Sequence, residues 1–110
     1  MHSIVIISTT FEHKNDGEKI SKLLLEDRLI GCAQLSGPIT SYYRWDGQIT
    51  ESIEFTLTLK TTVSLYEKVE ARLKEIHPYE LPEIIAQVVS LGSKEYQEWV
   101  GKEVGQSEND

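Results

Sequence analysis

Two long alternating stretches joined by a tight turn limit what this chain can fold into more than any other feature. Residues 33–45 and 49–59 alternate apolar and polar side chains with the period of two that β-strands show. Asp46-Gly47 between them is a strong β-hairpin signal, and Gly37-Pro38 predicts a kink or bulge in the first arm. The chain is therefore predicted to contain a hairpin with arms of about a dozen residues each.

The alternation predicts that one face of the hairpin is core and the other is wet. The core face contains Ala33, Leu35, Ile39, Tyr43 and Trp45 on the first arm, and Ile49, Ile53, Phe55, Leu57 and Leu59 on the second. Polar residues, Glu54 among them, occupy the alternate positions. We expect Glu54 to face solvent.

The remaining segments predict two further strands and three helices. An apolar run at residues 4–7 is the first strand, and residues 83–91 form the last strand of the sheet. The first helix is expected after the capping residues Asn15, Asp16 and Gly17, and it can stop at Gly31. The second helix is expected to start with a Ser64–Glu67 capping box and to end by His77, before Pro78. A third helix is expected over residues 94–102. The order predicts an α+β, ferredoxin-like β-α-β-β-α-β sandwich with a long β-hairpin and an extra C-terminal helix.

The length of the chain suits one domain. At 110 residues it can bury roughly two-thirds of its unfolded surface in one core. We expect a single domain over residues 1–104, followed by a polar tail at 105–110.

The hairpin is too long for the helices that should cover it. Arms of a dozen residues extend about 40 Å, whereas a helix of fourteen residues covers about 21 Å. Part of the hairpin must overhang, with Tyr42, Tyr43 and Trp45 near its end. An exposed apolar hairpin favours aggregation unless another subunit covers it, so we expect an oligomer.

Charge and cysteine content exclude several classes of protein. The net charge of −7 opposes binding to nucleic acid, whose affinity comes largely from Lys and Arg. Cys32 is the only cysteine, so an intrachain disulfide cannot form and a reducing compartment is expected. The sequence shows neither a signal peptide nor a membrane span, which together predict a cytoplasmic location without a membrane partner.

Four blocks of sequence together resemble a known family. They are Gly31-Cys32-Ala33, Ser41-Tyr42-Tyr43-Arg44-Trp45-Asp46-Gly47, Leu59-Lys60-Thr61-Thr62 and His77-Pro78-Tyr79-Glu80-Leu81-Pro82-Glu83-Ile84-Ile85. Occurring in this order, they resemble the CutA divalent-cation tolerance family, from the first strand to Trp99. The resemblance implies a cytoplasmic homotrimer of ferredoxin-like subunits, joined through the hairpins, with a role in tolerance of copper and other heavy metals.

A metal site is predicted from the types of side chain near the helix ends. Imidazole and thiolate suit copper, so His77 and Cys32 are candidate ligands, and Glu83 is a candidate oxygen donor. Their spacing requires a site assembled from distant segments or from different subunits. Structural roles remain open: Cys32 as a small buried residue after a helix, and His77 as a side chain at a helix end.

Some family members in which copper ligation is proposed imply a fuller set of ligands than this chain has. Where they have a cysteine at the end of the first strand and two histidines before Pro-Tyr, this chain has Ser8 and Ile76. Of these positions only His77 carries over.

A ligand pocket is predicted around the end of the hairpin and the segment after the second helix. Its candidate residues are Tyr43, Trp45, Lys60, Tyr79 and Glu80. The aromatic residues could instead form subunit contacts, Lys60 could pair with a carboxylate such as Glu54, and Glu80 could lie in water.

The leading hypothesis for function is a non-enzymatic homotrimer for divalent-cation tolerance, with weak binding of Cu(II), Cu(I) or another divalent metal and no organic cofactor. The alternative is a trimeric small-molecule sensor or signalling scaffold similar to PII proteins, although Asp46-Gly47 leaves no room for their long mobile loop. An enzyme with His77 as a base comes third, because no nucleophile or cofactor motif supports it.

Overall fold

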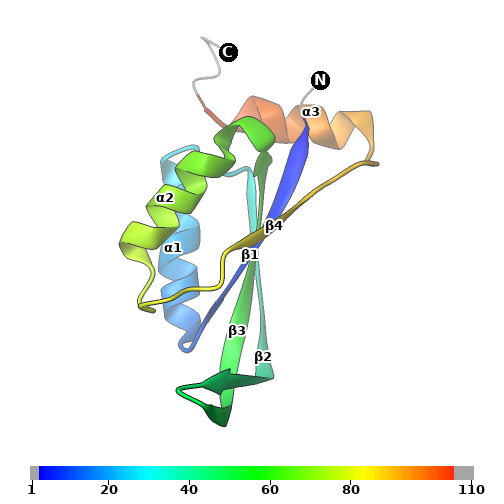
Figure 1. The fold of residues 1–110 in the computed structure, drawn as a ribbon. Coiled ribbons are helices and arrows are strands. Elements are labelled where there is room, and N and C mark those ends of the chain that lie inside the picture. The colour runs from blue at the N-terminus through cyan, green and yellow to red at the C-terminus, as the bar shows by residue number, and fades with distance from the viewer. Residues whose placement is uncertain (1–2, 106–110) are drawn as a thin grey trace.

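The computed structural model describes residues 3–105, which form one four-stranded sheet with helices in three places along the chain. The elements are β1 (Ile4–Phe11), α1 (Lys14–Glu26), β2 (Cys32–Trp45), β3 (Gln48–Thr62), the 3-10 helix η1 (Val63–Leu65), α2 (Tyr66–Ile76), β4 (Ile85–Val88) and α3 (Lys94–Glu103). Figure 1 shows α1 and α2 side by side on one side of the sheet, with α3 across its end.

The strand order is β2-β3-β1-β4, and every neighbouring pair is antiparallel. In the middle of the sheet, Ile7 lies opposite Leu59 on one side and Ala86 on the other. This arrangement confirms the predicted α+β, ferredoxin-like fold with its long hairpin and additional C-terminal helix.

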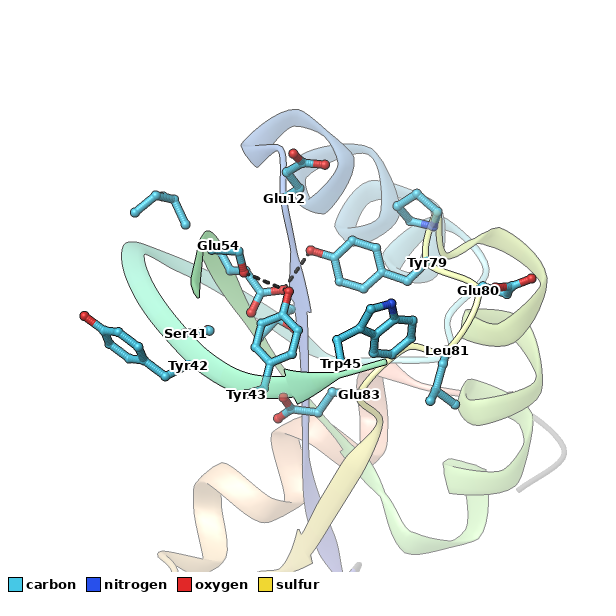
Figure 2. A pocket seen from close by; sticks show the side chains of 14 residues that line it. Glu12, Ser41, Tyr42, Tyr43, Trp45, Glu54, Tyr79, Glu80, Leu81 and Glu83 are labelled. Atoms are coloured by element: carbon cyan, nitrogen blue, oxygen red, sulfur yellow. Dashed lines mark hydrogen bonds between the residues drawn. The ribbon is translucent and has the colours of Figure 1, made fainter. Parts of the chain in front are cut away.

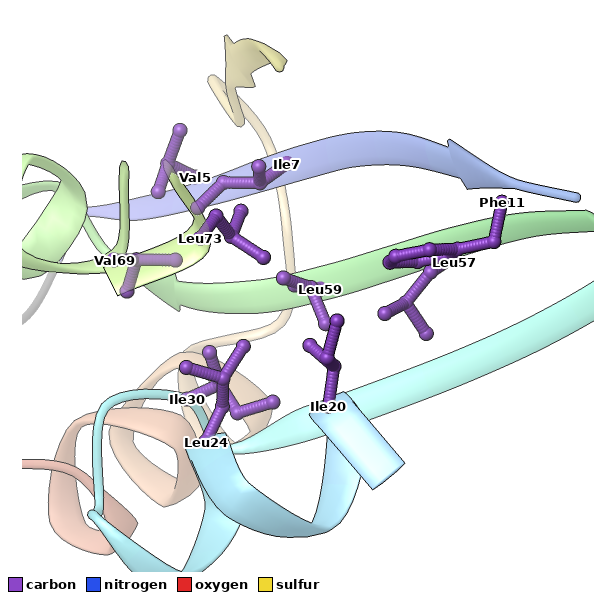
Figure 3. Packing of buried hydrophobic residues seen from close by; sticks show 10 residues of the cluster. All are labelled: Val5, Ile7, Phe11, Ile20, Leu24, Ile30, Leu57, Leu59, Val69 and Leu73. Atoms are coloured by element: carbon purple, nitrogen blue, oxygen red, sulfur yellow. The ribbon is translucent and has the colours of Figure 1, made fainter. Parts of the chain in front are cut away.

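The core lies between the sheet and the helices α1 and α2 (Figure 3). Its buried members are Val5, Ile7, Phe11, Ile20, Leu24, Ile30, Leu57, Leu59, Val69 and Leu73. Burying each such side chain contributes about 1.5–3 kcal/mol, so this cluster holds the helices against the sheet. Phe11 is completely buried at the end of β1, where the core gives way to the overhanging part of the hairpin.

The alternation of β3 predicts the core correctly on the helix-covered side of Phe55, but not between Phe55 and the hairpin turn. Leu57 and Leu59 are buried as expected, but Ile49 and Ile53 are exposed, and Glu54, predicted to face solvent, is buried. A bulge between Ser36 and Ile39 breaks the β2 register, as Gly37-Pro38 predicted. Bulges increase strand twist, and Figure 1 shows the end of the hairpin bending away from the rest of the sheet. The prediction of one continuous core face was therefore wrong beyond the bulge.

The helix ends differ from the predicted caps. Helix α1 starts at Lys14 with His13 as its N-cap, so Asn15, Asp16 and Gly17 lie inside the helix. It stops at Glu26, before Arg28 takes a positive φ of 58°, rather than at Gly31. The backbone N–H of Gly31 instead donates to the carbonyl of Lys60, which fixes the start of β2 beside β3.

The predicted Ser64–Glu67 capping box is also absent. The turn η1 precedes α2, whose N-cap is Leu65 without a side-chain cap bond. The Ser64 hydroxyl lies 3.1 Å from that of Thr62 instead. The C-terminal end was predicted correctly, because α2 ends at Ile76 and His77 has an extended backbone.

The C-terminal third contains a shorter strand than expected. Strand β4 covers four residues, Ile85–Val88, rather than 83–91. The predicted tail lies outside the described residues except for Gly105, whose N–H donates to the carbonyl of Arg28 at 2.7 Å.

Within residues 3–105, no helix is both long enough and apolar enough to cross a membrane.

Candidate functional site

A cavity of about 770 Å³ lies where the end of the hairpin faces the segment that follows α2 (Figure 2). The hairpin contributes Tyr43, Trp45 and Glu54, and the segment contributes Tyr79 and Glu83. Two features form the cavity. The bulge in β2 turns the end of the hairpin, and α2 ends before Pro78, from where the chain crosses to β4. Its volume is in the range of small-molecule sites.

A short hydrogen bond joins the two sides of the cavity. The Tyr79 hydroxyl donates to Oε2 of Glu54 at 2.7 Å. Burial, followed by the hydrogen bond to Glu54 and the charge of that carboxylate, raises the pKa of Tyr79 well above its ordinary value. Tyr79 therefore stays protonated near neutral pH and acts as a fixed donor to Glu54.

His77 lies behind the cavity as a buried link between α2 and β1. Its Nε2 is 3.0 Å from both the Thr9 hydroxyl and the Thr10 carbonyl, and its Nδ1 accepts the N–H of Tyr79 at 3.1 Å. The ring also stacks on Phe11, with centroids 4.4 Å apart. These contacts connect the core to the first aromatic residue of the cavity wall.

The partners of His77 define its protonation state. A backbone N–H can only donate, so Nδ1 must be an acceptor, and the Thr10 carbonyl can only accept, so Nε2 carries the proton. Burial lowers the pKa of His77, although the Thr10 carbonyl and the charges of Asp16 and Glu54 oppose this shift. The ring is therefore neutral, and metal binding at either nitrogen would break a hydrogen bond.

This neutral histidine predicts a loss of stability in mild acid. The unfolded chain takes up a proton near pH 6.5, whereas the folded chain does so only at lower pH. Stability should be fully present above pH 6.5 and fall below it, by at most about 1.4 kcal/mol per pH unit. Denaturant unfolding at fixed protein concentration measures this slope. His77→Gln should flatten it, and equal slopes in the two proteins would contradict the assignment.

The three predicted metal ligands do not meet within the described chain. His77 lies beside Thr9 and Thr10, whereas Cys32 pairs with Lys60 at the level of Ile6 on the neighbouring strand. Residues 3–105 contain no group of three or more His, Cys, Asp or Glu side chains placed to hold one ion. The side chains present therefore do not form a ready metal centre within one chain, and ligation by Cys32, His77 and Glu83 stays a prediction.

Cys32 and Lys60 instead lie beside α3. The Lys60 ammonium lies 5.8 Å from the centre of the Tyr96 ring. Burial, followed by the charge and hydrogen bonding of Cys32, raises the pKa of Tyr96, which places the thiol next to that hydroxyl. Lys60 does not line the cavity because its position on β3 is five residues beyond Phe55, away from the hairpin end.

The other ligand-pocket candidates lie around one cavity. Tyr43, Trp45, Tyr79 and Glu80 line the cavity, and so does Glu83. Sequence reasoning missed Glu54, because strand alternation places it among solvent-facing residues. Only Gly37-Pro38, which predicts a bulge in the neighbouring strand β2, could have indicated that Glu54 does not follow the alternation of β3.

The lining defines what this site can do chemically. Among residues 3–105, the lining combines aromatic rings with carboxylates and includes no Lys, Arg, His or Cys side chain. Such a surface can attract and hold a positively charged group.

Known proteins resemble the chain over nearly its whole length. A sequence model of the family described as CutA1 divalent ion tolerance protein matches residues 5–103. The divalent-cation tolerance protein CutA of Pyrococcus horikoshii is 39% identical over 100 residues, which cover 91% of this chain and 97% of that protein. The CutA protein of Thermus thermophilus is 36% identical over 105 residues, covering 96% and 100%.

Solved structures agree with the sequence matches. The crystal structure of CutA from Xylella fastidiosa has a TM-score of 0.90 and 35% sequence identity, and the match covers 93% of this chain and 98% of that one. The CutA1 structure from Oryza sativa has a TM-score of 0.92 at 26% identity, covering 96% and 97%. With a family match that spans residues 5–103, the chain belongs to the CutA1 divalent ion tolerance protein family.

Proposed function

We propose that this chain is a non-enzymatic divalent-cation tolerance protein that works in the cytoplasm as a homotrimer and binds divalent metal, copper included, weakly. The observation that carries the proposal is the overhanging hairpin, together with membership of a family named for divalent ion tolerance. Metal binding and trimer formation are separate parts of the proposal, and each has its own test.

The hairpin supports assembly because its end leaves large apolar side chains in water. Tyr42, Trp45, Ile49 and Ile53 are each about half exposed or more, up to 76% for Ile49. Beyond Phe55, β3 no longer pairs with β1, and within residues 3–105 these side chains stay largely exposed. Apolar patches of this kind mark sites of protein association.

We expect the protein to sediment as a trimer, with three times the chain mass of 12.5 kDa. Ile49→Lys should shift it toward monomer, because a charge would be buried in the contact. Leu25→Lys on α1 is the matched control, since Leu25 is also exposed but lies away from the hairpin. A trimer that tolerates Ile49→Lys as well as Leu25→Lys would contradict assembly through the hairpin.

The carboxylates of the cavity support weak metal binding better than His77 does. Glu83 is exposed, and no His, Lys or Arg within residues 3–105 forms an ion pair with it. Both nitrogens of His77 already have partners. The weakest calcium sites of proteins have dissociation constants of about 10⁻⁴–10⁻³ M, and low ligand number and low rigidity weaken binding, so we expect an affinity of this order here.

Calorimetric titration of the reduced assembly with Cu(II) tests metal binding. We expect a weak site of this order, reduced in Glu83→Gln and unchanged in His77→Gln, while Cys32→Ser tests the thiol. No heat in any protein at millimolar copper would overturn direct metal binding.

The cavity favours a second candidate function, a small-molecule sensor. A volume of about 770 Å³ exceeds what one metal ion requires and falls within the range of organic ligands. A thermal-shift panel of metabolites tests this function without reference to copper, and a panel without any response would contradict it.

A further inference from the structure

We propose that the cavity at the end of the hairpin binds an organic ammonium ion, held by Glu54 and by the aromatic rings around it. The proposal deepens the sensor function and does not depend on metal binding. It rests on the charge, the aromatic wall and the size of the cavity.

The first argument is a buried negative charge without a cation beside it. Glu54 is about nine-tenths buried, and its one hydrogen-bond partner in residues 3–105 is the neutral Tyr79 hydroxyl. No Lys or Arg in the described part of the chain forms an ion pair with it. A buried carboxylate without a counter-charge is destabilising, so a cation that enters the cavity would be strongly favoured there.

The geometry leaves Glu54 able to accept a second bond. Tyr79 occupies Oε2, whereas Oε1 has no hydrogen bond, and no fully buried side-chain oxygen in the described residues lacks a partner. Oε1 is therefore not fully buried, and Glu54 is one of the residues that line the cavity. Tyr79 fixes the direction of the carboxylate, which prepares the second oxygen for an N–H donor from a ligand.

The remaining charges around the cavity have the same sign. Glu12, Glu80 and Glu83 line it together with Glu54. Of these three, only Glu12 forms an ion pair with a basic side chain of residues 3–105, with His13 Nε2 at 3.7 Å on the exposed surface. The field inside the cavity therefore selects cations and disfavours phosphates and carboxylates.

Aromatic rings form the other part of the wall. Figure 2 shows the side chains of Tyr43, Trp45 and Tyr79 around one space, with the Glu83 carboxylate at its edge. The Tyr43 hydroxyl is 3.2 Å from that of Ser52, which holds this ring on the hairpin. Rings stabilise ammonium groups through cation–π contacts, worth about 0.5–2 kcal/mol each.

The size of the cavity favours an organic cation over a metal ion. Its volume of about 770 Å³ corresponds to roughly 25 water molecules. No three potential metal ligands converge anywhere in residues 3–105. An ammonium group on a carbon chain can contact a carboxylate and several rings at once, which a hydrated metal ion cannot do.

The test uses three four-carbon compounds that differ in charge. The assembled protein is titrated calorimetrically with 1,4-diaminobutane, with uncharged 1,4-butanediol and with succinate, and thermal shifts are recorded in parallel. We expect binding and an upward shift in melting temperature for the diamine only. Binding of butanediol or succinate in preference to the diamine would overturn the cation assignment while leaving a sensor function standing.

Two variants locate the binding site. Glu54→Gln keeps the shape of the side chain. Tyr43→Leu removes a cavity ring that is 41% exposed and is not in the patch assigned to the subunit contact, so this variant should fold and assemble normally. Each should weaken diamine binding about tenfold. Glu51→Gln is the control, because Glu51 is an exposed carboxylate on the same strand that does not line the cavity. Its affinity should stay within about twofold of the wild type.

Other results would overturn the proposal. If Glu54→Gln and Glu51→Gln lose affinity equally while the aromatic variant loses none, the diamine binds through net charge alone. If the diamine does not bind the wild type at all, the cavity is not an ammonium site, whether it is filled by a basic side chain of a second copy or stays hydrated.

Discussion

Replacing His77 with alanine is expected to lower the free energy of unfolding by about 4 kcal/mol. His77 is buried, with an exposed fraction of 8%, and its ring stacks on that of Phe11. Removing a buried ring costs about 3–5 kcal/mol through lost contacts and the cavity that remains. The change also leaves the N–H of Tyr79 and the carbonyl of Thr10 without their partner. Guanidinium chloride unfolding at fixed protein concentration measures the difference.

His77→Gln separates the two contributions. A glutamine amide can still donate toward the Thr10 carbonyl, but it does not reproduce the stacked ring. We expect it to recover part of the loss, leaving a cost of about 2 kcal/mol. If alanine and glutamine cost the same, packing against Phe11 would account for the whole effect; a loss below about 1 kcal/mol for alanine would contradict the structural role of His77.

The position of His77 explains why such a loss would also reach the cavity. The residue ends α2, bonds to the end of β1 and accepts the N–H of Tyr79, whose hydroxyl holds Glu54. In His77→Ala, Tyr79 should lose its fixed backbone position, and diamine binding should weaken although His77 does not line the cavity. His77 thus supports the wall of the cavity through Tyr79, and its ligation of a metal stays a prediction.

The order of elements could be predicted because local patterns determine it. Alternation in the hairpin, the Asp46-Gly47 turn and the stop before Pro78 each depend on residues close in sequence. The helix starts were wrong for the same reason, since His13 and Leu65 become N-caps without any side-chain cap bond. Packing of Ile20 and Val69 against the sheet sets these helices more strongly than local capping does.

The site was predicted only in part because its contacts are long-range. The aromatic residues at the hairpin end and the Pro-rich segment line the two sides of the cavity, and whether a ligand binds there stays a prediction. The bond between His77 and Thr9 joins residues 68 apart, and the bond between Tyr79 and Glu54 joins residues 25 apart. No periodicity indicates such partners, so the sequence assigned Glu54 to solvent although it is buried.

Replacing Gly37 with alanine is expected to lower the free energy of unfolding by about 3 kcal/mol. Gly37 lies in the β2 bulge with a φ of 132°, which side chains other than that of glycine rarely adopt. An added Cβ would lie 3.1 Å from the carbonyl oxygen of Glu54 and 3.0 Å from the Phe55 ring. The strand must shift to relieve these contacts, and denaturant unfolding measures the resulting loss.

Gly47→Ala provides the matched control, because it separates backbone strain from crowding. Gly47 also has a positive φ, of 76°, but an added Cβ there would have no neighbour within 4 Å. Strain alone should cost about 1 kcal/mol, so the extra cost at Gly37 reports the contact with β3. Because that contact is with the backbone of Glu54, Gly37→Ala should also weaken diamine binding, whereas Gly47→Ala should not. Equal costs at both glycines would show that the bulge yields freely and does not fix the position of Glu54.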